Sequence, residues 1–110
     1  MLKAGIIRCR QTEDMCSGRA DFRIASAGKL AFKETGPVEI VGFVSCEGCP
    51  GKRAVSRAGM MVEDGAEVIS LASCISRGNP IGFPCPHFKE IRAGIVKACG
   101  GAVKIIDWTH

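Results

Sequence analysis

Four short apolar segments alternate with three helical patterns along the 110 residues of the chain. The segments that predict strands are residues 3–9, 38–46, 67–74 and 102–110. The patterns that predict helices cover residues 20–33, 52–64 and 86–99. The second and third strand segments are nearly continuous apolar runs, which is typical of strands covered on both faces. This alternation predicts an α/β fold with a four-stranded parallel sheet and right-handed crossovers.

The strand order that we predict is 2-1-3-4, which is common among doubly wound, flavodoxin-like or Rossmann-like sheets. In this order the first crossover helix lies on one face of the sheet and the other two helices lie on the opposite face, so the domain is a three-layer sandwich. One face then carries a single short helix, and a homodimer that covers this thin face is a further hypothesis. The length suits one domain, so we expect residues 1–110 to form a single unit.

Composition and charge favour an ordinary globular protein and argue against two classes of partner. Hydrophobic residues make up 46% of the chain and charged residues 24%. No apolar run approaches the roughly 20 residues that cross a bilayer, and charges follow the first apolar residues too early for a signal peptide. The net charge is +4, with one Trp and no Tyr to stack on bases. We therefore expect a cytoplasmic protein that binds neither membranes nor nucleic acid.

Seven cysteines are unusual in a chain of this length. Their number is odd and we find no export signal, which argues against a secreted disulfide framework. In a reducing compartment, so many thiols indicate metal binding or thiol redox chemistry instead.

The cysteines follow the predicted strands rather than being scattered. Three of them end strands, namely Cys9, Cys46 and Cys74. Four further candidates lie in the loops that follow these strands, namely Cys16, Cys49, Cys85 and His87. Because the carboxyl ends of parallel strands share one edge, we expect all seven at the edge where open α/β sheets build their sites.

Two other candidates receive a structural interpretation. Cys99 falls elsewhere, four residues after Ile95 on a packed helical stripe, and we interpret it as a core residue. His110 is the last residue, and chain ends tend to fray. The carboxylates near the edge are more often surface charges, and we assign none of them a catalytic role. Whether the protein is an enzyme stays undecided at this point.

Metal binding is the first chemical interpretation of this edge. Thiolates and imidazole are zinc ligands, and thiolates alone hold iron–sulfur clusters. The spacing of Cys46 and Cys49 lets one turn bring both sulfurs to one ion. A second C-x2-C pair is absent, so further ligands must come from separate strand ends. The candidates exceed the four that one zinc needs, which leaves two metals, a cluster, or a metal beside a redox pair open.

Thiol redox and oxyanion binding are the other two interpretations. Cys46 and Cys49 lie between a strand and a predicted helix N-terminus, where the helix dipole favours thiolates. Lys52 and Arg53 add positive potential there, and we predict that they stabilise the thiolates as cofactor-binding residues. An oxyanion loop of the C-x5-R type is not matched, because Cys46 and Arg53 are separated by six residues.

The segments IIRCRQTEDMCSG, FVSCEGCPGKRA, ASCISRGNPIGFPCPHF and IIDWTH together resemble the CGGC domain family over essentially the whole chain. The resemblance implies a metal-binding domain in which Cys46 and Cys49 are the name-giving pair. It also implies that the other family features are Cys9, Cys16, Cys74, Cys85 and His87, without Cys99. The motif here reads CEGC, with Glu47 in place of the first glycine. We expect only Gly48 to need a left-handed backbone, and Glu47 to offer an oxygen near the site.

These observations lead to one predicted function and one alternative. The predicted function is binding of zinc, or of an iron–sulfur cluster, through Cys46, Cys49, Cys74 and Cys85. Further ligands or redox partners are Cys9, Cys16 and His87. The alternative is a thiol-based oxidoreductase that uses the pair Cys46 and Cys49.

Overall fold

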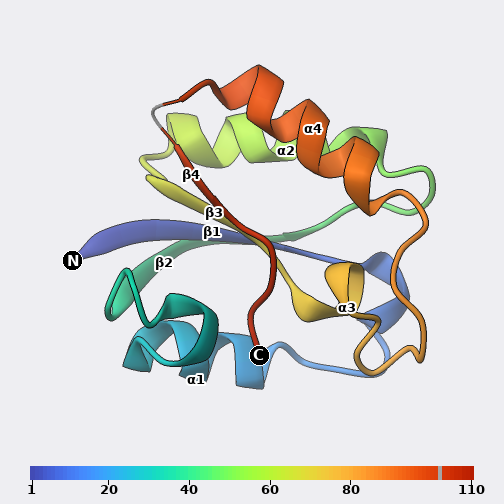
Figure 1. Cartoon of the computed structure of the whole chain (residues 1–110), viewed down its shortest axis with the longest axis horizontal. Helices are drawn as coiled ribbons and strands as arrows, with labels where there is room; N and C mark the ends of the chain where they lie inside the picture. The colour runs from blue at the N-terminus through green and yellow to red at the C-terminus, as the bar shows by residue number, and fades with distance from the viewer. Residues whose placement is uncertain (102) are drawn as a thin grey trace.

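The computed structural model of the protein describes residues 1–101 and 103–110. Its sheet has four parallel strands in the order β2-β1-β3-β4, which confirms the predicted topology (Figure 1). The strands are β1 (Leu2–Arg8), β2 (Val38–Ser45), β3 (Val68–Leu71) and β4 (Lys104–Ile106).

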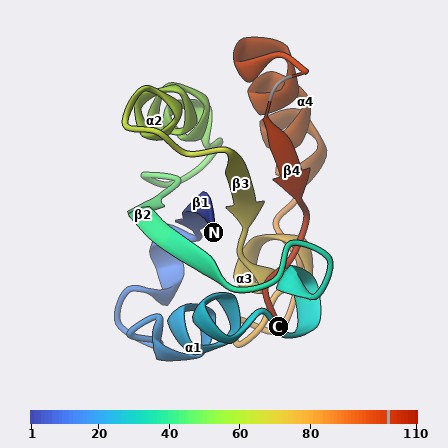
Figure 2. The ribbon, with the colours of Figure 1, turned by 90° about the vertical axis from the view of Figure 1, so that its left-hand side faces the viewer.

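The helices form two layers, one on each face of this sheet. They are α1 (Arg19–Ala27), α2 (Lys52–Glu63), α3 (Ser73–Ser76) and α4 (Phe88–Cys99), with short 3-10 turns η1 (Arg10–Thr12) and η2 (Leu30–Phe32). Figures 1 and 2 show α2 and α4 side by side on one face and α1 on the other. This is the three-layer arrangement that the strand order predicts.

Two glycines let helix α2 approach the sheet closely. Gly5 of β1 and Gly42 of β2 are paired in register, and Met61 of α2 lies over both. A Cβ atom at Gly5 or Gly42 would lie 2.7 or 2.6 Å from the Met61 sulfur, so a larger residue at either position would push the helix away. The buried faces of the central strands, including Ile6, Ile69 and Leu71, complete the core.

Three predicted elements end earlier than the sequence pattern indicates. The first helix stops at Gly28, whose φ of +66° ends α1, and the chain continues through η2 to the end of the predicted range. The third strand stops at Leu71, and α3 follows, because a short buried apolar run has the same pattern in a strand and in a helix. The last strand is only β4, and residue 102, where its predicted range begins, lies outside the described residues.

Two burial expectations are corrected as well. β3 is buried along its whole length, but β2 lies at a sheet edge and its central residues are only half-buried. An apolar run therefore does not distinguish an edge strand from a central one. The apolar stripe of the last predicted helix also places Ile91, Ile95 and Ala98 on the buried face; on α4, Ile91 and Ile95 are buried, whereas Ala98 is exposed. No helix among the described residues is long and apolar enough to cross a bilayer.

Candidate metal centre

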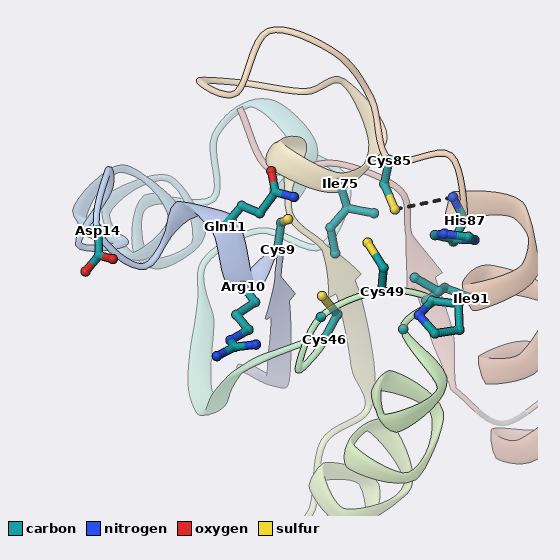
Figure 3. Close-up of a pocket in the computed structure, with 13 residues that line it drawn as sticks. Cys9, Arg10, Gln11, Asp14, Cys46, Cys49, Ile75, Cys85, His87 and Ile91 are labelled. Atoms are coloured by element: carbon teal, nitrogen blue, oxygen red, sulfur yellow. Dashed lines mark hydrogen bonds between the residues drawn. The ribbon is translucent and has the colours of Figure 1, made fainter.

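A pocket of about 310 Å³ opens at the carboxyl ends of the strands. Four cysteines and one histidine line this pocket, which we call the thiol pocket: Cys9, Cys46, Cys49, Cys85 and His87. Figure 3 shows their side chains gathered between η1, the loop before α2 and the start of α4. The sequence places these five residues in one site, and the structure brings them together.

Strand ends position two of the sulfurs. Cys9 directly follows β1 and Cys46 directly follows β2, and the Cys46 N–H donates to the Arg8 carbonyl at 2.8 Å. Cys46 is buried, with 6% of its surface exposed, whereas Cys49 is exposed in the loop that precedes α2. The pair therefore has one buried and one accessible thiol.

The loop between α3 and α4 supplies the remaining thiol and the histidine. The N–H of Cys85 donates to the Ile75 carbonyl at 2.8 Å, which ties this loop to α3. The N–H of His87 donates to the Cys85 sulfur at 3.4 Å (Figure 3). An N–H donor favours the thiolate form of the sulfur that it contacts.

The backbone of the CEGC segment corrects our expectation for Glu47. Both Glu47 and Gly48 have left-handed backbones, with φ of +72° and +114°. The glycine that the family carries at the first position is therefore explained by the local conformation, and glutamate is strained there. The Glu47 carboxylate accepts a hydrogen bond from Arg57 at 2.9 Å and does not line the thiol pocket.

We expect the variant Glu47→Gly to be more stable than Glu47→Ala by about 1 kcal/mol. Both variants lose the partly exposed ion pair with Arg57 (2.9 Å), but only glycine relieves the left-handed strain. Urea unfolding of the two variants measures this difference. Equal stabilities would show that the backbone at residue 47 is not strained.

Gly51 fixes the approach of this loop to helix α4. Its φ is +81°, and a Cβ atom at this position would lie 2.5 Å from Cδ1 of Ile91. Both Gly51 and Ile91 line the thiol pocket, so this close packing shapes its wall.

Burial and repulsion between sulfurs raise the pKa values of two thiols of the pocket, Cys9 and Cys85. Burial raises the pKa of Cys9 to about 11, although the Gln11 N–H opposes this shift, and repulsion from Cys46, Cys74 and Cys85 adds to it. Burial also raises the pKa of Cys85, with further repulsion from Cys49, Cys46 and Glu90. These sulfurs are close enough to repel one another as anions, and a cation among them would reverse that effect.

Cys74 and Cys16 lie outside the thiol pocket, although the sequence groups them with the other thiols. Cys74 lies in α3, and its sulfur accepts hydrogen bonds from the Cys9 N–H at 3.1 Å and from Thr12 Oγ1 at 3.8 Å. It lines a small cavity of about 30 Å³ together with Cys9, Cys49 and Cys85. Cys16 and Cys74 both line a second pocket, which shares none of its described lining residues with the thiol pocket.

The cations of the thiol pocket differ from those that we predicted. Lys52 and Arg53 are exposed on the first turn of α2 and do not line the pocket, whereas Arg10 does. Arg10 follows Cys9 directly in sequence, and that adjacency is the signal that could have identified it. Cys99 packs against the core, in line with its structural interpretation.

The described side chains do not form a preassembled metal site. Across residues 1–101 and 103–110, no three Cys, His, Asp or Glu side chains stand in positions that could hold one ion. The donor set of the thiol pocket nevertheless fits a thiophilic metal, because four thiols and an imidazole face one cavity. A change of χ1 rotamer re-aims a thiol without moving the backbone, and this is a motion that could bring the donors of the pocket around one ion.

The fold and this pocket define a cysteine-rich, doubly wound α/β domain. The CGGC domain model matches residues 3–110, and the chain belongs to the CGGC domain family. The chain is also similar to the uncharacterized protein MJ0582 of Methanocaldococcus jannaschii, with 34% identity over 79 residues. That match covers 66% of this chain and 62% of the relative. No solved structure matches the chain.

Proposed function

We propose that the thiol pocket binds a single zinc ion through Cys46, Cys49, Cys85 and Cys9. The observation that carries this proposal is the convergence of four thiols, from two strand ends and two loops, on one pocket of about 310 Å³. Membership of the CGGC domain family supports metal binding in general. His87, which also lines the pocket, is the nitrogen donor that would replace one thiol.

The electrostatics at Cys9 and Cys85 favour metal ligands over free nucleophiles. A reactive cysteine needs a lowered pKa, whereas the pKa values of Cys9 and Cys85 are raised. A divalent cation removes the repulsion between thiolates that contributes to these shifts. Four thiolates also suit an iron–sulfur cluster, and the colour of the protein distinguishes it from zinc.

A second candidate function is a thiol oxidoreductase that uses Cys46 and Cys49. The exposure of Cys49 within the pocket favours it, because a substrate can reach this sulfur from solvent. In that case Cys49 attacks a disulfide substrate, displaces its leaving thiolate, and Cys46 then displaces the substrate's other sulfur to form the Cys46–Cys49 disulfide. The two functions differ in what masks the thiols: a chelator releases them if metal is bound, and a reductant releases them if they are oxidised.

The pH dependence of zinc affinity tests the proposed function. Because the pKa values of Cys9 and Cys85 are raised, both thiols carry protons at neutral pH and release them when zinc binds. Affinity should therefore rise with pH between 6 and 8, by about tenfold per unit for each proton released. Competition with a chromophoric chelator measures the affinity, and a pH indicator in weak buffer counts the protons. Affinity that does not change with pH, or no binding at all, would contradict the proposal.

A further inference from the structure

The C-terminal tail is anchored beside α1 rather than frayed. Ser73 Oγ donates to the His110 carbonyl at 2.7 Å and accepts from the N–H groups of His110 and Thr109 at 3.0 and 3.1 Å. The N–H of Ser73 donates in turn to Thr109 Oγ1 at 3.2 Å. Figures 1 and 2 both show the chain end next to α1. Our expectation that His110 frays is therefore wrong, and its imidazole has a defined place.

That place is beside a buried carboxylate that lacks a hydrogen-bond partner. Asp21 on the first turn of α1 is only 5% exposed, and its Oδ1 atom is fully buried without a hydrogen bond among the described residues. The imidazole of His110 lies beside it, with its Nε2 atom 3.4 Å from this oxygen. A buried carboxylate without compensation is costly, so this arrangement calls for a proton or a cation between the two side chains.

The separation of these two atoms fits a shared metal ion. Two ligands that each lie about 2.0–2.1 Å from a tetrahedral zinc are roughly 3.3–3.4 Å apart. The separation of 3.4 Å between Asp21 Oδ1 and His110 Nε2 is therefore that of two adjacent ligands, whereas it is long for a charge-assisted hydrogen bond.

Two thiols line the same cavity. This second pocket, of about 210 Å³, contains Asp21, His110, Cys16 and Cys74 in its wall. The sulfur of Cys16 accepts a hydrogen bond from the Gly18 N–H at 3.4 Å, and that of Cys74 accepts one from the Cys9 N–H at 3.1 Å. Two sulfurs, one imidazole nitrogen and one carboxylate oxygen form a donor set that suits zinc and its neighbours among the transition metals.

The wall of this pocket also contains a positive charge, that of Arg8, which already interacts with other groups of the protein. The guanidinium of Arg8 donates to the Cys16 carbonyl at 2.7 Å and lies 5.1 Å from the centre of the Phe43 ring. Its charge opposes a cation in the pocket, but a carboxylate and two thiolates outweigh it. The same hydrogen bond fixes the loop that carries Cys16.

We propose that this second pocket is a separate binding site for one zinc-class divalent cation, with Asp21, His110, Cys16 and Cys74 as ligands. The carboxylate and the imidazole already stand at ligand spacing. In the proposed site, the Cys16 side chain, which lies in a loop, turns toward Asp21 and His110. The sulfur of Cys74 is the fourth ligand. The site differs from the thiol pocket because none of the residues described as lining one pocket lines the other.

Anaerobic titration of the full chain with Co²⁺ tests this proposal, since sulfur-bound Co²⁺ absorbs in the visible and near-ultraviolet. The wild type should bind two ions, and Asp21→Asn and His110→Gln should each bind one tightly, with at least tenfold weaker binding of the other. Asp64→Asn, the same change at an exposed carboxylate, should still bind two. The double variant Cys46→Ser, Cys49→Ser should lose the ion of the thiol pocket alone.

The variants separate failure of this proposal from failure of the proposed function. If Asp21→Asn and His110→Gln bind metal as the wild type does, the second pocket holds only water or a His–Asp ion pair, and the proposal is overturned. If the wild type binds one ion and loses it only through Asp21 or His110, the second site stands and the thiol pocket does not. Circular dichroism checks folding, and His110→Gln, which keeps the backbone anchors to Ser73, decides the matter if Asp21→Asn unfolds.

Discussion

Replacement of Cys49 by serine should weaken zinc binding at the thiol pocket by at least about 100-fold, because loss of a ligand costs more than loss of a residue that only orients one. Cys49 is the most accessible thiol of the pocket, so the change removes a sulfur without opening a cavity in the core. Serine is neutral at pH 7 and is a poor zinc ligand. Chelator competition measures the affinity, and thermal unfolding without metal shows that the fold is retained.

Cys99→Ser is the matched control for this variant. Cys99 ends α4 and packs against the core, and it does not line the thiol pocket. Its replacement should leave zinc affinity unchanged within about twofold. An unchanged affinity in Cys49→Ser, with loss of thiol reactivity toward disulfides, would instead favour the oxidoreductase.

The second large effect concerns the loop that carries Cys85. Gly78 has φ +80°, and a Cβ atom there would overlap the backbone carbonyl of Phe83. We expect Gly78→Ala to destabilise the protein by about 3 kcal/mol or more, because backbone strain and a backbone clash act together. The loop cannot yield easily, since the Gly78 N–H donates to the Ser73 carbonyl at 2.9 Å and its carbonyl accepts from Gly82. Displacement of Cys85 should weaken zinc binding as well.

Gly82→Ala separates the clash from the strain. Gly82 lies in the same loop with φ +111°, and nothing surrounds a Cβ atom at this position. Its replacement should cost only the strain, about 1–2 kcal/mol. Urea unfolding of both variants gives the comparison. Equal losses would mean that the close packing of Gly78 on Phe83 contributes nothing to stability.

The topology could be predicted from the sequence because the hydrophobic periodicity distinguishes the helices from the strands along the chain. The stripe of Ala54, Ala58 and Met61 marks α2, whereas α1 stops at Gly28, before the end of its predicted range at residue 33. What the sequence could not reveal was where an apolar run changes from strand to helix. The segment that ends at Cys74 would be buried as a strand and is buried as a helix, so nothing in its composition indicates that α3 begins after Leu71.

The sequence predicted that the thiols gather at the carboxyl edge of the sheet, but it did not predict that they divide between two pockets. The thiols that follow the strands lie at the carboxyl edge, but the Cys74 sulfur accepts a hydrogen bond from the Cys9 N–H and lines a second cavity together with Cys16. This division depends on side-chain direction, which strand order does not specify. Asp21 was missed, and His110 was interpreted as a fraying end, for a related reason: the two residues are distant in sequence, and Ser73 anchors the tail that carries His110.

The most direct test of the central claim is the metal content of the protein purified without oxygen and without chelator. Elemental analysis for zinc and iron, together with a visible spectrum, gives both the identity and the number of ions. We expect a colourless protein with close to one zinc in the thiol pocket and a second, chelator-sensitive ion that is lost in Asp21→Asn. Iron with matching sulfide and a brown colour would identify a cluster. A protein free of metal, whose Cys49 reacts rapidly with disulfides, would contradict the account.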